Sequence, residues 1–164
     1  MFVNSDFSDL LKIFNDKGVR YLVVGGYAVI QYAEPRFTKD LDLWIATDAK
    51  NAEAIYTALK EFGAPLQNLT NKDFSEEGYF YQMGSPPVRV DVIMGLKGMD
   101  FEKAWENKVD TQFDNLKVSF ISKADLIKSK LASGRPQDLQ DAKSLGASPR
   151  RPPPRQRPVK KKNK

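Results

Sequence analysis

The apolar residues of this chain recur with two different periods, which predict alternating helices and strands. Four apolar residues within Ser5–Asp16 follow the helical period, and Gly18 is placed to end that helix. Further helices are predicted over residues 27–32, 49–62 and 99–107, after the N-cap pattern of Ser122 and Asp125, and from Pro136 onward. Strands are predicted over residues 19–24, 41–46, 78–83, 88–93 and 116–121, and those at 78–83 and 88–93 form a hairpin. The chain contains no internal repeat.

Two aspartates lie one residue apart at the start of the second predicted strand. Asp40 and Asp42 alternate with Leu41, Leu43 and Ile45, so the strand can bury its apolar face while both carboxylates point the other way. Carboxylate oxygens are the ligands that Mg²⁺ accepts. The pair predicts a divalent-metal site, and the alternative is a half-buried strand with hydrated acids.

A glycine pair precedes this strand. Gly25 and Gly26 follow the apolar strand at residues 19–24 and come directly before the short helix at 27–32. Glycines allow close backbone approach, and free N–H groups at a helix N-terminus attract anions. The arrangement predicts a phosphate site, and the alternative is an ordinary turn.

A third aspartate lies within an apolar strand further along the chain. Alternation over residues 88–93 places Asp91 on the same face as Arg89 and opposite the valines. An unpaired buried carboxylate costs several kcal/mol, so such a residue is paired, bound to a metal or exposed. With Asp40 and Asp42 available, we expect a three-carboxylate site; an edge-strand position or an ion pair is the alternative.

In this combination the chain resembles the nucleotidyltransferase superfamily that includes DNA polymerase β. The resemblance rests on Gly25-Gly26, on the R-x-T-x-D-x-D stretch from Arg36 to Asp42, and on Asp91. Within the superfamily it looks most like the small bacterial enzymes, including abortive-infection toxin-type and lincosamide- or aminoglycoside-modifying relatives, because KLASGRPQDLQDA at residues 130–142 resembles their C-terminal motif. The similarity covers about residues 19–145. Many members have Ser where this chain has Gly26, so backbone amides would replace a hydroxyl contact to the triphosphate.

The resemblance implies an α/β (α+β) nucleotidyltransferase fold, a mixed, strongly twisted sheet with flanking helices mainly on one face. It implies transfer of a nucleoside monophosphate from a nucleoside triphosphate to an acceptor hydroxyl, with release of pyrophosphate. Asp40 and Asp42 would bridge two Mg²⁺ ions, with Mn²⁺ as a possible substitute, and Asp91 would bind the ion nearest the acceptor and deprotonate the hydroxyl. Gly25 and Gly26 would hold the β- and γ-phosphates. The acceptor stays open among RNA ends, small molecules and proteins.

Several cations flank these motifs. Arg36 and Lys39 stand directly before the Asp40 strand and are predicted to contact the triphosphate, with Thr38 fixing their loop. The alternative for Arg36 is an ion pair with Glu34. Lys130 and Arg135 could approach the same phosphates, and the alternative is that they are surface cations at a helix end.

Other polar and aromatic residues are given structural roles. Asp138 and Asp141 are predicted to cap and solvate the last helix. Trp44 and the aromatics at 79–81 are predicted to lie in the core, with nucleobase stacking as the alternative.

Composition narrows the chemistry. The chain of 164 residues contains no Cys and no His, which excludes disulfides, thiolate nucleophiles and the usual zinc sites and removes the commonest general base. Residues 1–148 fit one domain. The N-terminus has neither a basic leader nor a long apolar run, so we expect a cytoplasmic protein without membrane contact.

The net charge of +5 conceals two regions. Residues 149–164 contain eight Lys or Arg and no acid, which leaves 18 basic and 21 acidic residues and a charge of −3 for the rest. Prolines and like charges predict a disordered tail, which could recruit RNA or be an incidental extension.

Two alternatives to an independent enzyme remain. The chain could be a non-catalytic nucleotide- or RNA-binding relative, or a toxin–antitoxin or resistance-operon component that depends on an operon-encoded protein partner. The presence of all three carboxylates favours catalysis.

Overall fold

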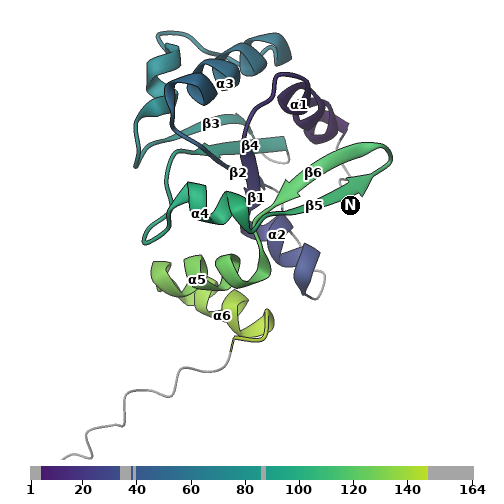
Figure 1. The fold of residues 1–164 in the computed structure, drawn as a ribbon, viewed down its shortest axis with the longest axis vertical. Coiled ribbons are helices and arrows are strands. Elements are labelled where there is room, and N and C mark those ends of the chain that lie inside the picture. The colour runs from purple at the N-terminus through teal and green to yellow at the C-terminus, as the bar shows by residue number, and fades with distance from the viewer. Residues whose placement is uncertain (1–4, 34–37, 39, 86–87, 148–164) are drawn as a thin grey trace, which may run out of the picture.

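The computed structural model describes residues 5–33, 38, 40–85 and 88–147. Its α-helices are α1 (Ser5–Asp16), α2 (Gly25–Tyr32), α3 (Ala49–Phe62), α4 (Phe101–Glu106), α5 (Lys123–Ser133) and α6 (Pro136–Ser144), with a 3₁₀-helix η1 (Asn71–Ser75). Its strands are β1 (Tyr21–Val24), β2 (Asp40–Ile45), β3 (Phe80–Ser85), β4 (Val88–Ile93), β5 (Val109–Phe113) and β6 (Leu116–Phe120). Figure 1 shows how these elements follow one another.

The strands form one mixed six-stranded sheet in the order β3-β4-β2-β1-β6-β5. β2 pairs in parallel with β4 and antiparallel with β1, so the two strands with predicted site residues lie side by side near the middle. β1 pairs in parallel with β6, and the hairpins β3–β4 and β5–β6 form the two edges. The fold is the mixed α/β arrangement that the sequence predicts.

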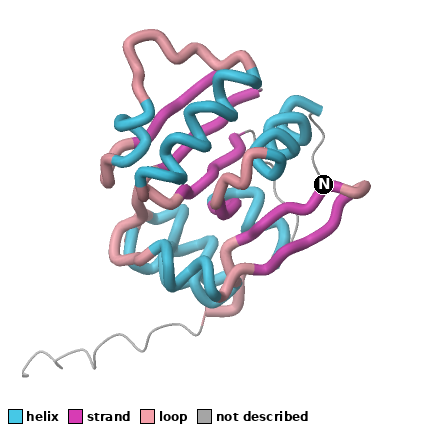
Figure 2. Tube along the Cα trace, turned by 45° about the horizontal axis from the view of Figure 1, so that its top comes forward, coloured by secondary structure: helices cyan, strands magenta, loops and turns pink. Residues whose placement is uncertain are grey.

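Helices cover both faces of the sheet, which corrects the expectation that they lie mainly on one face. Figures 1 and 2 show α1 and α3 on one side of the strands and α5 and α6 on the other. Alternation along β2 explains the two layers. Its residues 41, 43 and 45 are fully buried on one face, whereas Trp44, on the face of Asp42, packs edge-on against Phe101 of α4 with ring centroids 5.2 Å apart.

Local sequence explains where the helices begin and end. The Asp48 carboxylate accepts a hydrogen bond from the N–H of Asn51 at the start of α3, and Gly63 ends that helix in the left-handed conformation at φ 92°. The Ser122 hydroxyl accepts from the N–H of Asp125 at the start of α5, and Pro136 is at the first turn of α6. The cap at Ser122 and the place of Pro136 match the sequence-based expectations.

Several elements differ from those expectations. The strand β5 and the 3₁₀-helix η1 were not expected, and α2 begins at Gly25, two residues earlier than predicted. The predictions for Arg36, Lys39 and the basic tail at 149–164 fall outside the described residues.

Within the described chain, no helix is both long enough and apolar enough to cross a membrane.

Candidate active site

The three predicted carboxylates lie on two adjacent parallel strands. In the ladder between β2 and β4, Asp42 is directly opposite Asp91, and Asp40 is directly opposite Arg89. Alternation therefore places all four side chains on one face of the sheet. The structure brings together residues that the sequence separates by the whole of α3, η1 and β3.

Asp42 is the most perturbed acid of the group. Burial raises its pKa to about 7, and the charges of Asp91 and Asp40 and a hydrogen bond with Asp91 act in the same direction. The ammonium of Lys130 opposes this rise but does not cancel it. A carboxylate whose pKa is raised to near neutrality by burial and by neighbouring like charges is typical of a functional site.

Helix α2 begins against this same carboxylate. Gly25 has a φ of +69°, and a Cβ placed there would lie 2.1 Å from Oδ2 of Asp42. Glycine is therefore required at 25 both for its backbone conformation and for space. Val24, the N-cap residue, makes no side-chain capping hydrogen bond to the helix. Gly26 follows Gly25 and is buried in the first turn of α2.

Asp91 has polar partners within the protein. The Nε and Nη2 atoms of Arg89 donate to its two carboxylate oxygens at 3.3 and 3.1 Å, and Nε2 of Gln82 donates to Oδ1 at 3.0 Å. Nε of Arg89 also lies 3.7 Å from Oδ2 of Asp40. The ion pair that was the alternative explanation for Asp91 is thus present, alongside the cluster of acids.

The acids do not converge on one point in this conformation. Among the described residues, no group of three or more His, Cys, Asp or Glu side chains is arranged to hold a metal ion. The residue types and their common face nevertheless suit a hard cation, because all three aspartates present carboxylate oxygens. Residue type and backbone position therefore fit a divalent metal, whereas the side chains of Asp40 and Asp91 are directed to Arg89.

The C-terminal helices contribute a second charged group. Nζ of Lys130 on α5 lies 3.0 Å from Oδ1 of Asp138 and 3.2 Å from Oδ2 of Asp141 on α6. The side chain of Asp141 is only 3 % exposed. The prediction that these two acids cap and solvate the last helix is wrong, because the N-cap residue of α6 is Arg135. Both acids instead bind Lys130, since the left-handed turn at Gly134 folds α6 back onto α5.

The two predicted phosphate-binding cations of this region differ in placement. The side chain of Lys130 is 12 % exposed and close enough to Asp42 to affect its pKa, so it lies within the site. The side chain of Arg135 is 81 % exposed and pairs with Asp138 at 3.2 Å.

A cavity of about 650 Å³ joins these parts. Its floor is formed by β2, β3, β4 and the end of β1 with the start of α2, and its wall by α5 and α6. Asp40, Asp42, Asp91, Lys130 and Arg135 all line it. Thr38 lies half-buried in the loop before β2 and is not among the described lining residues.

Two aromatic residues also reach this cavity. Tyr79 and Phe80 line it and are 63 % and 64 % exposed, so the prediction that they belong to the core is wrong. Phe80 begins the edge strand β3, which has a neighbouring strand on one side only, and Tyr79 directly precedes it. The prediction is confirmed for Trp44, which is 2 % exposed.

The sequence matches a family model described as "Nucleotidyltransferase of unknown function (DUF6036)" over residues 3–148. The chain belongs to this nucleotidyltransferase family. A comparison of the nucleotidyltransferase with curated proteins found no match.

Solved structures share the fold of this nucleotidyltransferase. The lincosamide antibiotic adenylyltransferase LnuA, solved with lincomycin bound, is 18 % identical with a TM-score of 0.55, covering 89 % of this chain and 98 % of that one. ANT(2'')-Ia in complex with adenylyl-2''-tobramycin is 11 % identical with a TM-score of 0.57, covering 86 % of each chain. An antigenic nucleotidyltransferase-like protein from Paracoccidioides brasiliensis is 20 % identical with a TM-score of 0.52, covering 84 % of this chain and 72 % of that one.

Proposed function

We propose that this nucleotidyltransferase transfers a nucleoside monophosphate from a nucleoside triphosphate to an acceptor hydroxyl in a Mg²⁺-dependent reaction. The observation that carries the proposal is the pairing of Asp42 with Asp91 across β2 and β4, with Asp40 on the same face and the start of α2 against Asp42. Asp40, Asp42 and Asp91 would hold the metal. When bound, Mg²⁺ would neutralise phosphate charge and lower the pKa of the acceptor hydroxyl.

The start of α2 supports a place for the terminal phosphates. The backbone N–H groups of Gly25 and Gly26 lie in the first turn of the helix, where amides lack intrahelical acceptors and the helix dipole favours an anion. The close packing of Gly25 on Asp42 would hold these amides next to the carboxylates. Lys130, oriented by Asp138 and Asp141, would add a positive charge from the opposite wall.

The acids of the site provide a proton acceptor. The acceptor O–H proton would pass to the carboxylate of Asp91, which Gln82 orients through its hydrogen bond. The acceptor oxygen would form a bond to the α-phosphorus as the bond from that phosphorus to the bridging oxygen breaks, and pyrophosphate would leave. Burial and the neighbouring charge of Asp91 raise the pKa of Asp42, the acid opposite Asp91 on β2.

A labelling experiment tests the proposal. The full-length protein is incubated with each α-labelled nucleoside triphosphate, Mg²⁺ and one acceptor preparation at a time: total RNA, lincomycin, tobramycin or a protein mixture. The last three follow from the acceptor classes left open and from the ligands named for LnuA and ANT(2'')-Ia. Label transfer with stoichiometric pyrophosphate in one arm is expected.

Asp42→Asn is the informative variant, and Asp48→Asn is its matched control, because Asp48 is an ion-paired acid outside the cavity. Loss of transfer and of Mg²⁺-dependent triphosphate binding in the first variant alone supports the site. Triphosphate binding that is equal in both variants and independent of Mg²⁺ would refute it.

A further inference from the structure

Arg89 lies where the carboxylates of the site would otherwise face one another. Its guanidinium donates to both oxygens of Asp91 and lies 3.7 Å from Asp40, the residue opposite it on β2. The guanidinium is therefore in contact with two of the three acids and electrostatically coupled to the third, Asp42. No other described cation is ion-paired with Asp40 or Asp91.

This placement accounts for the arrangement of the acids. Gathering carboxylates on one face brings like charges together, and each must be compensated by a proton, a cation or water. Asp91 and Asp40 direct oxygens to Arg89, and the described acids do not converge on a common point. The guanidinium and a divalent cation would thus require the same oxygens.

The side chain of Arg89 also has room to move away from the carboxylates. Its side chain is 33 % exposed and lines the cavity of about 650 Å³, so space is available beside the carboxylates. Partly exposed ion pairs contribute little net stability, because water compensates both partners when they separate. Gln82 would remain hydrogen-bonded to Asp91 and preserve the orientation of its carboxylate.

We propose that Arg89 is the resident counter-ion of the site, competing with the divalent cation for Asp40 and Asp91 and leaving both carboxylates when the cation binds. This inference rests on the proposed function. It assigns to Arg89 a positioning role: the residue keeps three acids together in the metal-free protein and weakens metal binding until it is displaced.

Direct binding of Mn²⁺, measured by calorimetry without nucleotide at pH 8, tests this competition. Arg89→Met is expected to bind Mn²⁺ about tenfold more tightly than the wild type, since unit charges about 4 Å apart near a protein surface repel strongly. Arg89→Lys, which keeps the charge but loses the bidentate geometry, is expected to fall between them.

Two matched variants separate competition from general charge effects. Lys97→Met removes an exposed cation from the lining of the same cavity, and Arg20→Met removes another arginine that bridges two acids, Asp48 and Glu102. Both are expected to keep the wild-type Kd for Mn²⁺. Equal tightening in Lys97→Met and Arg89→Met would overturn the proposal, because the effect would then be unspecific electrostatics.

The remaining outcomes are distinct. A measurable and equal Kd for the wild type and Arg89→Met would overturn the role of Arg89 and leave the metal site standing. No Mn²⁺ binding by either protein would refute the metal site itself, and the counter-ion proposal with it. Circular dichroism and thermal unfolding in EDTA establish that each variant is folded.

Discussion

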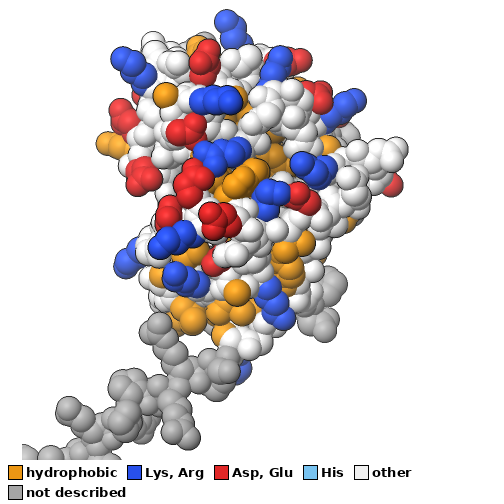
Figure 3. Space-filling view, in the orientation of Figure 1, with side chains coloured by type: hydrophobic (Ala, Val, Ile, Leu, Met, Phe, Trp, Pro, Cys, Tyr) orange, Lys and Arg blue, Asp and Glu red, His pale blue; other side chains and the backbone are white. Residues whose placement is uncertain are grey.

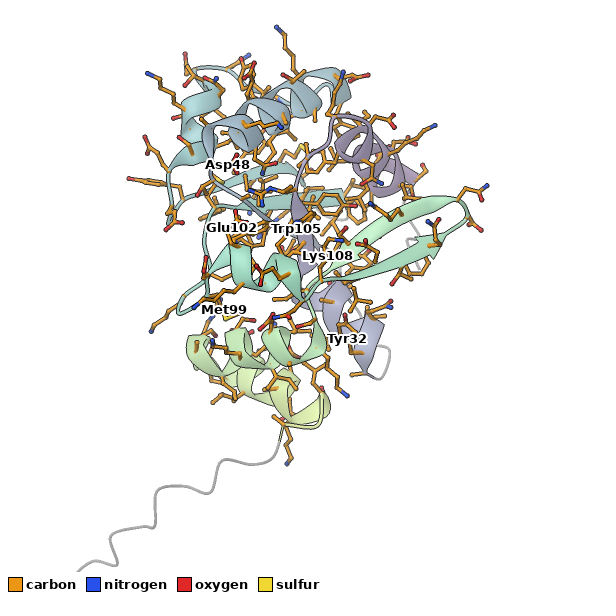
Figure 4. All side chains as sticks on the ribbon, viewed as in Figure 1. Tyr32, Asp48, Met99, Glu102, Trp105 and Lys108 are labelled. Carbon is orange, nitrogen blue, oxygen red and sulfur yellow. The ribbon has the colours of Figure 1, made fainter. Side chains whose placement is uncertain are left out.

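Two arginines of this protein each lie between two carboxylates, and their surroundings differ. Arg20 lies 2.8 Å from Asp48 and 2.7 Å from Glu102, with its guanidinium over the rings of Phe101 and Trp105 at 5.6 and 5.9 Å. Figure 4 shows Asp48, Glu102 and Trp105 gathered where the start of α3 meets α4. Arg89 has longer contacts of 3.1 and 3.7 Å to Asp91 and Asp40.

The pKa of Asp42 shifts in the opposite direction from those of the two acids around Arg20. Hydrogen bonding from Arg20 lowers the pKa of Glu102. For Asp48 the effect of burial is outweighed by hydrogen bonds from Arg20 and from the N–H of Asn51 and by the charge of Arg20, so its pKa is lowered too. In the cavity, burial and neighbouring acids raise the pKa of Asp42. The acids around Arg20 are therefore ion-paired within the protein, whereas the acids of the cavity keep an excess of negative charge that a ligand can use.

In the space-filling view, acidic and basic side chains are interspersed over the visible face, and apolar side chains reach the surface at the lower end, over α5 and α6 (Figure 3).

The largest effect is expected from neutralising one acid in each cluster. Asp42→Asn should lower kcat/KM by about a thousandfold or more, because it removes a charge that acts directly at the reacting phosphates. Asp48→Asn should leave kcat/KM unchanged, since Asn can still cap α3. Steady-state kinetics with Mg²⁺ and the acceptor identified by labelling would measure both. Similar losses in the two variants would remove the functional distinction between the clusters.

The second effect is on stability as a function of pH. Because the pKa of Asp42 is raised from 3.8 to about 7, its contribution to stability is fully present below about pH 4 and is lost as the pH rises through 7. Asp42→Asn should therefore be more stable than the wild type at pH 8 by about 4 kcal/mol, with the difference vanishing near pH 4. Urea unfolding in EDTA at several pH values measures this. A difference that does not change with pH contradicts the raised pKa.

Two glycines with the same backbone conformation offer a third comparison. Gly25 and Gly18 both have a φ of +69°, but a Cβ at 25 would overlap the Asp42 carboxylate, whereas at 18 it would meet nothing within 4 Å. Gly18→Ala should cost about 1 kcal/mol from backbone strain alone. Gly25→Ala should lower the free energy of unfolding by about 2 kcal/mol more than Gly18→Ala and should also weaken triphosphate binding. Denaturant unfolding measures the stability, and calorimetry measures the binding. Equal costs would show that Asp42 moves aside freely.

The smallest effect is expected at Arg20. Arg20→Met should destabilise the protein by about 1 kcal/mol, because its ion pairs are partly exposed and water compensates for much of their loss. The loss should shrink at high salt, and kcat/KM should stay at the wild-type value. Thermal unfolding at low and high salt measures the loss of stability and its dependence on salt. A tenfold fall in activity would place this cluster in the mechanism.

Those features of the site that follow from strand alternation can be predicted from the sequence, whereas those that depend on tertiary neighbours cannot. The common face of Asp40 and Asp42 follows from a period of two, and the Asp91 strand shows the same pattern. The burial of Asp141 could not be predicted, because it depends on the turn that folds α6 onto α5. The acidic, polar segment VDTQF of β5 has a weak strand pattern, and it pairs only because β6 lies beside it.

The sequence also leaves the partner of Asp91 undetermined. Arg89, two residues away on the same strand face, could be recognised as a neighbour, but its contact with Asp40 depends on the register between β2 and β4. Likewise, Gly25 and Gly26 are equivalent in the sequence, and only the packing of α2 on Asp42 shows that position 25 needs to be glycine.

The parallel pairing of β2 with β4 has a consequence for the order of folding. These strands are joined through α3, η1 and β3, so a long loop must close before Asp42 and Asp91 become neighbours. A nascent chain that ends before residue 88 contains the first two acids but neither the third nor Arg89. The repulsive cluster and its counter-ion therefore arise in the same folding step, when a single strand joins the sheet.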